Sequence, residues 1–198
     1  MYRIILCLCF ILSVSAKVRA QNTIEWRPDY TLQLSDFQAS STKIGRSDFI
    51  SITSGGNFSF AYQMSNGAFM FTKSFNSMVH CTFQRNAATI IAPDTATAMN
   101  LLNFARYQFD LAELYARKLR KALYEKKNAF SGADFFQPAF DSLQAAYQKR
   151  LGIAQTETQL GADTEKLHQL YQEVLQEIAT LPDYCESCKP KKKHHKRG

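Results

Sequence analysis

The sequence predicts an α+β fold in which an N-terminal antiparallel meander sheet precedes a long central helix and two further helices. Between Phe49 and Phe83, apolar and polar residues alternate with the period of two that is typical of strands. Three later stretches carry apolar residues at three- and four-residue steps, which is typical of amphipathic helices. Strands first and helices afterwards favour helices packed on one face of the sheet.

Residues 1–20 have the pattern of a removable export signal. A positive charge at Arg3 precedes an apolar stretch, and a small-residue exit ends at Ala20. Cleavage before Gln21 is the expected processing, with a cut after Ala16 as the alternative. No later segment is apolar for long enough to span a bilayer. We therefore expect an exported protein, periplasmic or extracellular, without a transmembrane span after signal removal.

The rest of the chain predicts one domain, residues 21–184, followed by a disordered basic tail, residues 185–198. The formal charge of the whole chain is +7; three cations lie in the signal and six in the tail, which leaves the domain near −2. The tail cations are Lys189, Lys191, Lys192, Lys193, Lys196 and Arg197. Such a run attracts anionic envelope surfaces. A merely solvated terminus is the alternative.

The strands are expected in the first half of the chain. A first strand with one buried aromatic lies near Trp26. Residues 54–57 and 65–67 contain the Gly, Asn and Ser that tight turns favour, so they separate strands of the meander. Further strands are expected at Phe69–Asn76 and Met78–Phe83.

The central helix is expected to run from an N-cap at Asp94 to Gly132. Its apolar face holds Leu102, Ala105, Phe109, Ala112, Ala116, Leu119 and Leu123. Its opposite, polar face holds Asn103, Arg106, Asp110, Glu113, Arg117 and Arg120. Pro138 opens a second helix at its first turn, Asp163 caps a third, and Pro182 stops it.

Residues 101–120 contain the pairs Leu101-Leu102, Phe109-Asp110 and Ala116-Arg117, together with Glu113. In this arrangement the stretch resembles the signature helix of a secreted bacterial family of predicted zinc-dependent peptidases, known as domain of unknown function nine-twenty-two. That helix typically reads Leu-Leu-x-His-Glu-x-x-His-Phe-Asp, then an acidic residue and an Ala-Arg pair. Trp26 and the corner Ser35-Asp36-Phe37 also resemble the start of that family. The resemblance implies a zincin-like domain.

The three chemical positions of that motif hold Phe104, Ala105 and Gln108 in this sequence. In the family pattern, two histidines one turn apart grip zinc and a glutamate takes a proton from the metal-bound water. Phenylalanine offers no lone pair, alanine carries no proton, and a glutamine amide replaces imidazole poorly. A Thr-x-His-Gly turn of the family corresponds to Thr158-Gln159-Leu160-Gly161, where Leu160 replaces the histidine. The resemblance thus implies a scaffold without its reaction centre.

No other metal or catalytic site is expected. Cys185 and Cys188 either close on each other as a disulfide in an oxidising compartment or, with the histidines at 194 and 195, bind metal. Three cysteines remain after processing, so at least one thiol is left over. His80 is expected to be an ordinary sheet residue and His168 to be solvated.

We therefore expect a non-catalytic homologue of a zinc-dependent peptidase, without cofactor or metal, that binds a protein partner or an extended peptide. An active metal-dependent peptidase with unrecognised ligands, with Glu113 or Asp110 taking part, is the first alternative. An envelope-associated protein that works through its basic tail is the second.

Overall fold

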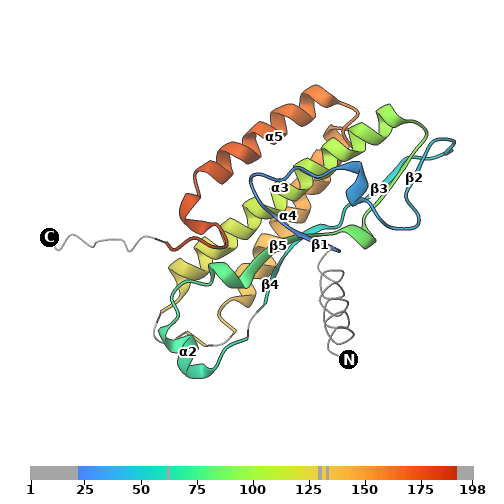
Figure 1. The fold of residues 1–198 in the computed structure, drawn as a ribbon. Coiled ribbons are helices and arrows are strands. Elements are labelled where there is room, and N and C mark those ends of the chain that lie inside the picture. The colour runs from blue at the N-terminus through green and yellow to red at the C-terminus, as the bar shows by residue number, and fades with distance from the viewer. Residues whose placement is uncertain (1–21, 62, 129–130, 133, 191–198) are drawn as a thin grey trace, which may run out of the picture.

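The computed structural model describes residues 22–61, 63–128, 131–132 and 134–190. The α+β class is confirmed, because small sheets on the N-terminal side precede a long helix and further helices (Figure 1). The strands are β1 (Thr23–Glu25), β2 (Lys43–Ile44), β3 (Ser51–Thr53), β4 (Gly56–Phe60), β5 (Val79–Gln84) and β6 (Thr89–Ala92). The helices are α2 (Asn66–Phe71), α3 (Thr95–Lys126), α4 (Gln137–Glu157) and α5 (Thr164–Ala179). The expected signal, residues 1–20, lies outside the described residues.

The strands form two three-stranded sheets instead of one continuous meander. One sheet has the order β1-β5-β4 and is antiparallel throughout. The other has the order β2-β6-β3, in which β2 runs parallel and β3 antiparallel to β6. The two central strands, β5 and β6, come last in the chain, so earlier strands add to their two sides. Alternation identifies strands but carries no information about which strands pair.

The strand expected at Phe69–Asn76 is wrong, because residues 66–71 form helix α2. The hydroxyl of Ser65 accepts a hydrogen bond from the backbone N–H of Ala68, which makes Ser65 an N-cap and not part of a hairpin turn. Phe69 is buried against the rings of Phe75 and Phe135, at centroid distances of 6.2 and 5.7 Å. The Ser65 cap and the burial of Phe69 therefore favour a short helix in a stretch whose apolar spacing also fits a strand.

Helix α3 runs through the middle of the molecule and contacts strands β4, β5 and β6 as well as helices α4 and α5 (Figure 1). Its expected N-cap is confirmed, since Oδ1 of Asp94 accepts from the N–H of Thr97 at 2.7 Å. The expected end at Gly132 is wrong, because the helix stops at Lys126. All seven residues of the predicted apolar face are buried. Glu113, Arg117 and Arg120 on the predicted polar face are buried too, because residues 178–186 cover them.

Helices α4 and α5 form an antiparallel pair against α3. Pro138 lies in the first turn of α4, and Oδ1 of Asp163 accepts from the N–H of Lys166 at the start of α5, as predicted. The turn between them has positive φ angles at Gln159, Leu160 and Gly161. At Gly161, with φ of 92°, an added Cβ would collide with the backbone oxygen of Asn100. Glycine therefore lets this turn lie directly on α3. No helix among the described residues is long and apolar enough to cross a membrane.

Candidate functional site

The positions that the resemblance assigns to zinc chemistry are occupied by packed side chains. Phe104 is 2% exposed and Ala105 fully buried, both on α3. The Cβ of Phe104 lies 3.2 Å from where a Cβ of Gly161 would be, so Phe104 underlies the α4–α5 turn. Leu160 of that turn packs against the core. The structure thus brings position 104 and the turn containing position 160 together.

Gln108 lies one turn after Phe104 on α3 and faces α4. Its amide nitrogen Nε2 donates a hydrogen bond to the hydroxyl of Tyr147 at 3.4 Å. Tyr147 is buried, and this burial raises the pKa of its hydroxyl to about 12. Positions 104 and 108 therefore serve helix packing. Within the described ranges, no group of three or more His, Cys, Asp and Glu side chains is arranged to hold a metal ion.

A buried charge cluster occupies the middle of α3, about two turns further on. Oε1 of Glu113 accepts hydrogen bonds from Nε of Arg117 at 2.8 Å and from Nη1 of Arg120 at 2.9 Å. Arg120 is 0% exposed and also donates to the backbone oxygens of Val79 and Tyr184. The cluster therefore ties α3 to strand β5 and to the C-terminal segment. Periodicity places these residues on the polar face of the helix and cannot show that a later segment returns to cover that face.

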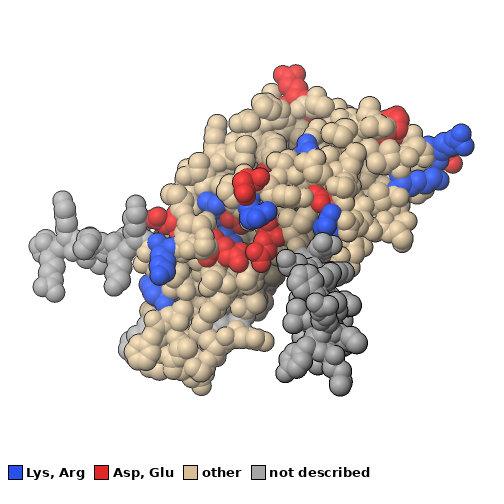
Figure 2. Space-filling model, in the orientation of Figure 1, with Lys and Arg blue, Asp and Glu red and all other residues tan. Residues whose placement is uncertain are grey.

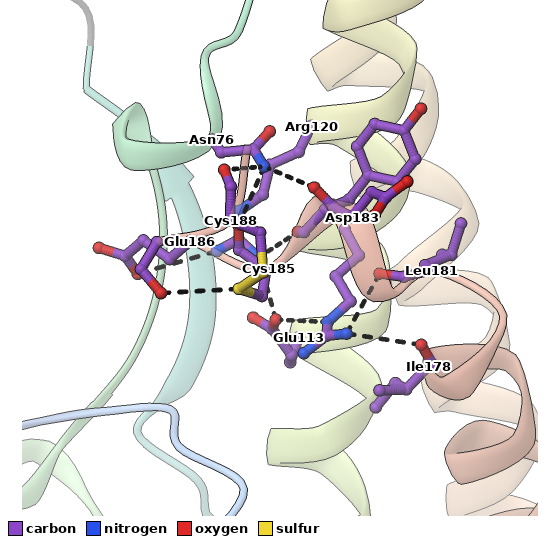
Figure 3. The surroundings of a disulfide bond; sticks show 12 residues. Asn76, Glu113, Arg120, Ile178, Leu181, Asp183, Cys185, Glu186 and Cys188 are labelled. Atoms are coloured by element: carbon purple, nitrogen blue, oxygen red, sulfur yellow. Dashed lines mark hydrogen bonds and ion pairs between the residues drawn. A yellow bond between two sulfur atoms is a disulfide. The ribbon is translucent and has the colours of Figure 1, made fainter. Parts of the chain in front are cut away.

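The covering segment ends in a disulfide loop, residues 182–188, shown in Figure 3. Cys185 and Cys188 form a disulfide, while Cys81 is a free, buried thiol. Nδ2 of Asn76 lies 3.0 Å from each of three backbone oxygens, those of Asp183, Cys185 and Cys188. Residues 185–188 therefore belong to the folded body and not to the disordered tail in which we expected them. Residues 191–198 of that tail lie outside the described part.

His80 has a partner that the sequence did not indicate. Its Nδ1 lies 2.9 Å from Oε1 of Glu186 in the disulfide loop, and Oε2 of Glu186 lies 3.8 Å from Nη2 of Arg120. His80 is thus more than an ordinary sheet residue, because it holds the loop to β5. His168 is exposed, as expected.

A hollow of about 670 Å³ opens between β1 and the disulfide loop. We call it the charged hollow; its charged lining residues are Glu25, Arg27, Glu113, Arg117 and Glu186. Figure 2 shows acidic and basic side chains gathered in the middle of this face, whereas most of the surrounding surface is uncharged. The charged hollow is the strongest candidate for a binding site, because it combines both signs of charge with a concave surface.

Trp26 separates the charged hollow from a smaller one of about 250 Å³. Its indole Nε1 donates to Oδ1 of Asp110, whose other oxygen accepts from the hydroxyl of Tyr171. Burial raises the pKa of Asp110, and the hydrogen bonds from Tyr171 and Trp26 offset part of that rise. The guanidinium of Arg117 lies 5.4 Å from the Trp26 ring centroid. Trp26 therefore connects the segment after β1 to Asp110 and Arg117 of α3, in addition to its apolar packing.

The residues that the sequence shares with the peptidase pattern hold the scaffold together. Asp36 accepts from the hydroxyl of Tyr30 at 2.8 Å and pairs with Arg85 at 3.2 Å. Both carboxylate oxygens of Asp110 and one of Glu113 also accept from protein donors. These carboxylates are already bound within the fold, which leaves them poorly placed as metal ligands.

Comparison of the chain with protein-family models, with curated proteins and with solved structures gave no match. Two regions of the molecule therefore carry the information about function: the packed positions around Phe104 and Gln108, and the charged hollow beside β1.

Proposed function

We propose that the protein is an exported, non-catalytic relative of predicted zinc-dependent peptidases and acts by binding a protein or an extended peptide. The observation that carries this proposal is the packing at positions 104, 105 and 108. Phe104 and Ala105 are buried, and the Gln108 amide is bound to Tyr147. These side chains fill space and supply no electron pair suited to zinc.

A binding role is supported by the position of β1 next to the charged hollow. In the described sheet, β1 is an edge strand that pairs with β5 alone. The N–H of Trp26 donates to Cys81 of β5, so the N–H of the preceding residue, Glu25, points to the open side. Glu25 also lines the charged hollow. An extended peptide that pairs with this edge would place its side chains in the hollow.

Restoring the motif tests whether positions 104, 105, 108 and 160 correspond to a zinc site. We expect a chain with Phe104→His, Ala105→Glu, Gln108→His and Leu160→His to retain about one zinc ion after dialysis, measured by elemental analysis. The matched control carries Met99→His and Asn103→His, a histidine pair at the same spacing elsewhere on α3. If the restored chain folds but holds no more zinc than this control, the resemblance is misleading. Chelator-sensitive proteolysis by the unaltered protein would instead support an active peptidase.

The binding mode is tested at Glu25. Peptides selected from a displayed library should lose roughly tenfold or more in affinity to Glu25→Pro, because proline removes the outward N–H. Glu25→Ala keeps that N–H and should bind nearly as well, which calorimetry can measure. Equal binding to the proline variant would rule out pairing at β1. Loss of binding in both variants would assign recognition to the Glu25 carboxylate.

A further inference from the structure

The smaller cavity, on the other side of Trp26 from the charged hollow, has a volume of about 250 Å³. We call it the apolar pocket. The segment after β1, helix α3 and helix α5 enclose it, and Figure 1 shows that segment passing beside α3. Leu32 and Phe109 line it as buried residues, whereas Leu175 is 39% exposed. The pocket therefore offers an apolar surface that is accessible from solvent.

Arg106 lines the apolar pocket and has no anionic partner within the described part of the fold. It is half-buried. The other buried or half-buried arginines among the described residues each pair with a carboxylate; these are Arg85, Arg117, Arg120 and Arg150. A guanidinium that is partly withdrawn from water without an anion is unfavourable. Arg106 is therefore positioned to pair with an anion that comes from outside the chain.

The guanidinium of Arg106 is also held in place. Its Nε donates to the backbone oxygen of Leu32 at 2.9 Å, and its Nη1 donates to Oδ1 of Asn103 at 2.9 Å. No described residue accepts a hydrogen bond from Nη2, so this end of the planar group keeps its N–H donors for a ligand. Because these two hydrogen bonds already fix the side chain, little conformational entropy is lost on binding.

The net charge around the apolar pocket favours an anion. The charged lining residues are Arg27, Arg106 and Asp110. The Asp110 carboxylate follows Arg106 by one helical turn, but it accepts from the side chains of Trp26 and Tyr171 instead. Two cations and one anion therefore give the lining a net positive charge.

We propose that the apolar pocket binds a carboxylate that carries an aromatic or branched aliphatic group. The apolar group lies against Phe109 and Leu175, and the carboxylate accepts hydrogen bonds from Arg106. A cavity of about 150 Å³ accepts benzene, so the larger apolar pocket accommodates one such group. This chemistry has two sources: a free small acid, or the carboxyl-terminal residue of a peptide. The second source rests on the peptide binding proposed at β1.

Ligand titration tests the proposal with Trp26 as the reporter, because it is the only tryptophan of the chain and lines the apolar pocket. Phenylacetate should change its fluorescence saturably, and calorimetry should give the dissociation constant. Phenylacetamide has nearly the same shape without the charge, and phenethylamine has the opposite charge. Both should bind roughly tenfold or more weakly. Equal affinity for the acid and the amide, or no saturable binding of phenylacetate, would overturn the proposal.

Arg106→Gln should weaken phenylacetate binding roughly tenfold or more and change phenylacetamide binding little. The matched control is Arg46→Gln, an exposed arginine between β2 and β3, which should bind both as the unaltered protein does. Leu175→Glu changes an exposed position of α5, so the fold should tolerate it. The new charge should weaken phenylacetate and strengthen phenethylamine. If Arg106→Gln folds and Leu175→Glu folds, and both bind phenylacetate normally, the proposed anion site is wrong.

Peptides separate the two sources of the ligand. An acetylated peptide that ends in phenylalanine should bind more tightly than phenylacetate if a peptide terminus is the ligand, and Glu25→Pro or a terminal amide should remove that advantage. If Glu25→Pro changes neither affinity, the ligand is a free small acid. Peptide binding at β1 without phenylacetate binding would overturn the pocket proposal and leave the proposed function intact. Phenylacetate binding without any peptide binding at β1 would support the pocket and contradict that function.

Discussion

The indole Nε1 of Trp26 donates a hydrogen bond to Oδ1 of Asp110 at 2.5 Å, between residues 84 positions apart in the chain. Tyr171 of α5 donates to the other oxygen of the same carboxylate. One side chain of α3 therefore connects the segment after β1 with the last long helix. This carboxylate is largely withdrawn from water and accepts hydrogen bonds from both side chains, so its ionisation is coupled to the stability of the domain.

Asp110→Asn should change how stability depends on pH. Burial raises the folded-state pKa of Asp110 above its ordinary value of 3.8, so the folded protein keeps a proton that the unfolded chain has released. The free energy of unfolding contributed by this group therefore falls as the pH rises from 3.8 through the folded-state pKa, and then levels off. Asparagine does not titrate, so urea midpoints of the variant should lack this slope.

Asp94 provides a control of opposite sign. Its hydrogen bonds to Thr97 lower its pKa, so its contribution to stability is present above 3.8 and is lost as the pH falls through the folded-state pKa. Asp94→Asn keeps a good N-cap and should remove only that acid-side loss. If Asp110→Asn and Asp94→Asn change the pH profile in the same direction, the assignment of burial as the dominant influence on Asp110 is wrong.

Glu113→Gln should destabilise the protein strongly. The carboxylate is the anionic partner of both Arg117 and Arg120, and Arg120 is fully buried. Removing the charge takes away the nearest anion of both cations and leaves Arg120 with only the Glu186 carboxylate at 3.8 Å, which costs about 3–5 kcal/mol. Glu177→Gln breaks half-exposed ion pairs with Lys118 and Arg150 and should cost about 1 kcal/mol or less. Equal urea midpoints for the two variants would contradict the importance of the buried cluster.

Gly161→Ala should lower stability by about 2 kcal/mol or more, because the new Cβ meets the Asn100 oxygen and the φ of 92° is strained for alanine. Gly152→Ala is the matched control inside α4, where an added Cβ has nothing within 4 Å. Alanine favours the helix there and should stabilise the protein by about 0.5–1 kcal/mol. Thermal unfolding of both variants measures the difference, and a tolerated alanine at 161 would show that the turn does not lie on α3.

Asn76→Asp should loosen the disulfide loop without touching the disulfide. The amide Nδ2 serves three backbone oxygens, and a carboxylate would offer them repulsion in place of a donor. Loss of these hydrogen bonds costs about 1–3 kcal/mol. Hydrogen exchange should become faster in residues 182–188 and remain slow in α5. Uniformly faster exchange over the whole domain would show instead that the loop does not open separately.

Local sequence signals predicted the three long helices well, although they missed α2. Asp94, Pro138 and Asp163 each start a helix as expected, since capping and the fixed φ of proline act through neighbouring backbone atoms. The apolar stripe of α3 is buried throughout, because its three- and four-residue spacing puts these side chains on one face of the helix. In contrast, α3 ends at Lys126 and not at Gly132, because a glycine signals a possible stop and cannot show where packing ends the helix.

The charged hollow could not be predicted from local patterns. Glu113, Arg117 and Arg120 become buried only because residues 178–188 fold back over α3. That contact depends on Asn76, which no motif singled out. Trp26, Asp110 and Glu113, which belong to two separate stretches of the sequence pattern, lie in the same region: Trp26 is hydrogen-bonded to Asp110 and lines the charged hollow with Glu113. The zinc-peptidase relationship itself stays a prediction.

The attachment of Asn76 to Cys188 joins residues 112 positions apart in the chain. Such a contact is expensive to form early in folding, because a long flexible loop must close before any other interaction rewards it. We therefore expect the loop to dock in a late kinetic step, after α3, α4 and α5 have assembled. Until that step Arg120 remains hydrated, so the native arrangement of the cluster is reached only when the slowest part of folding is complete.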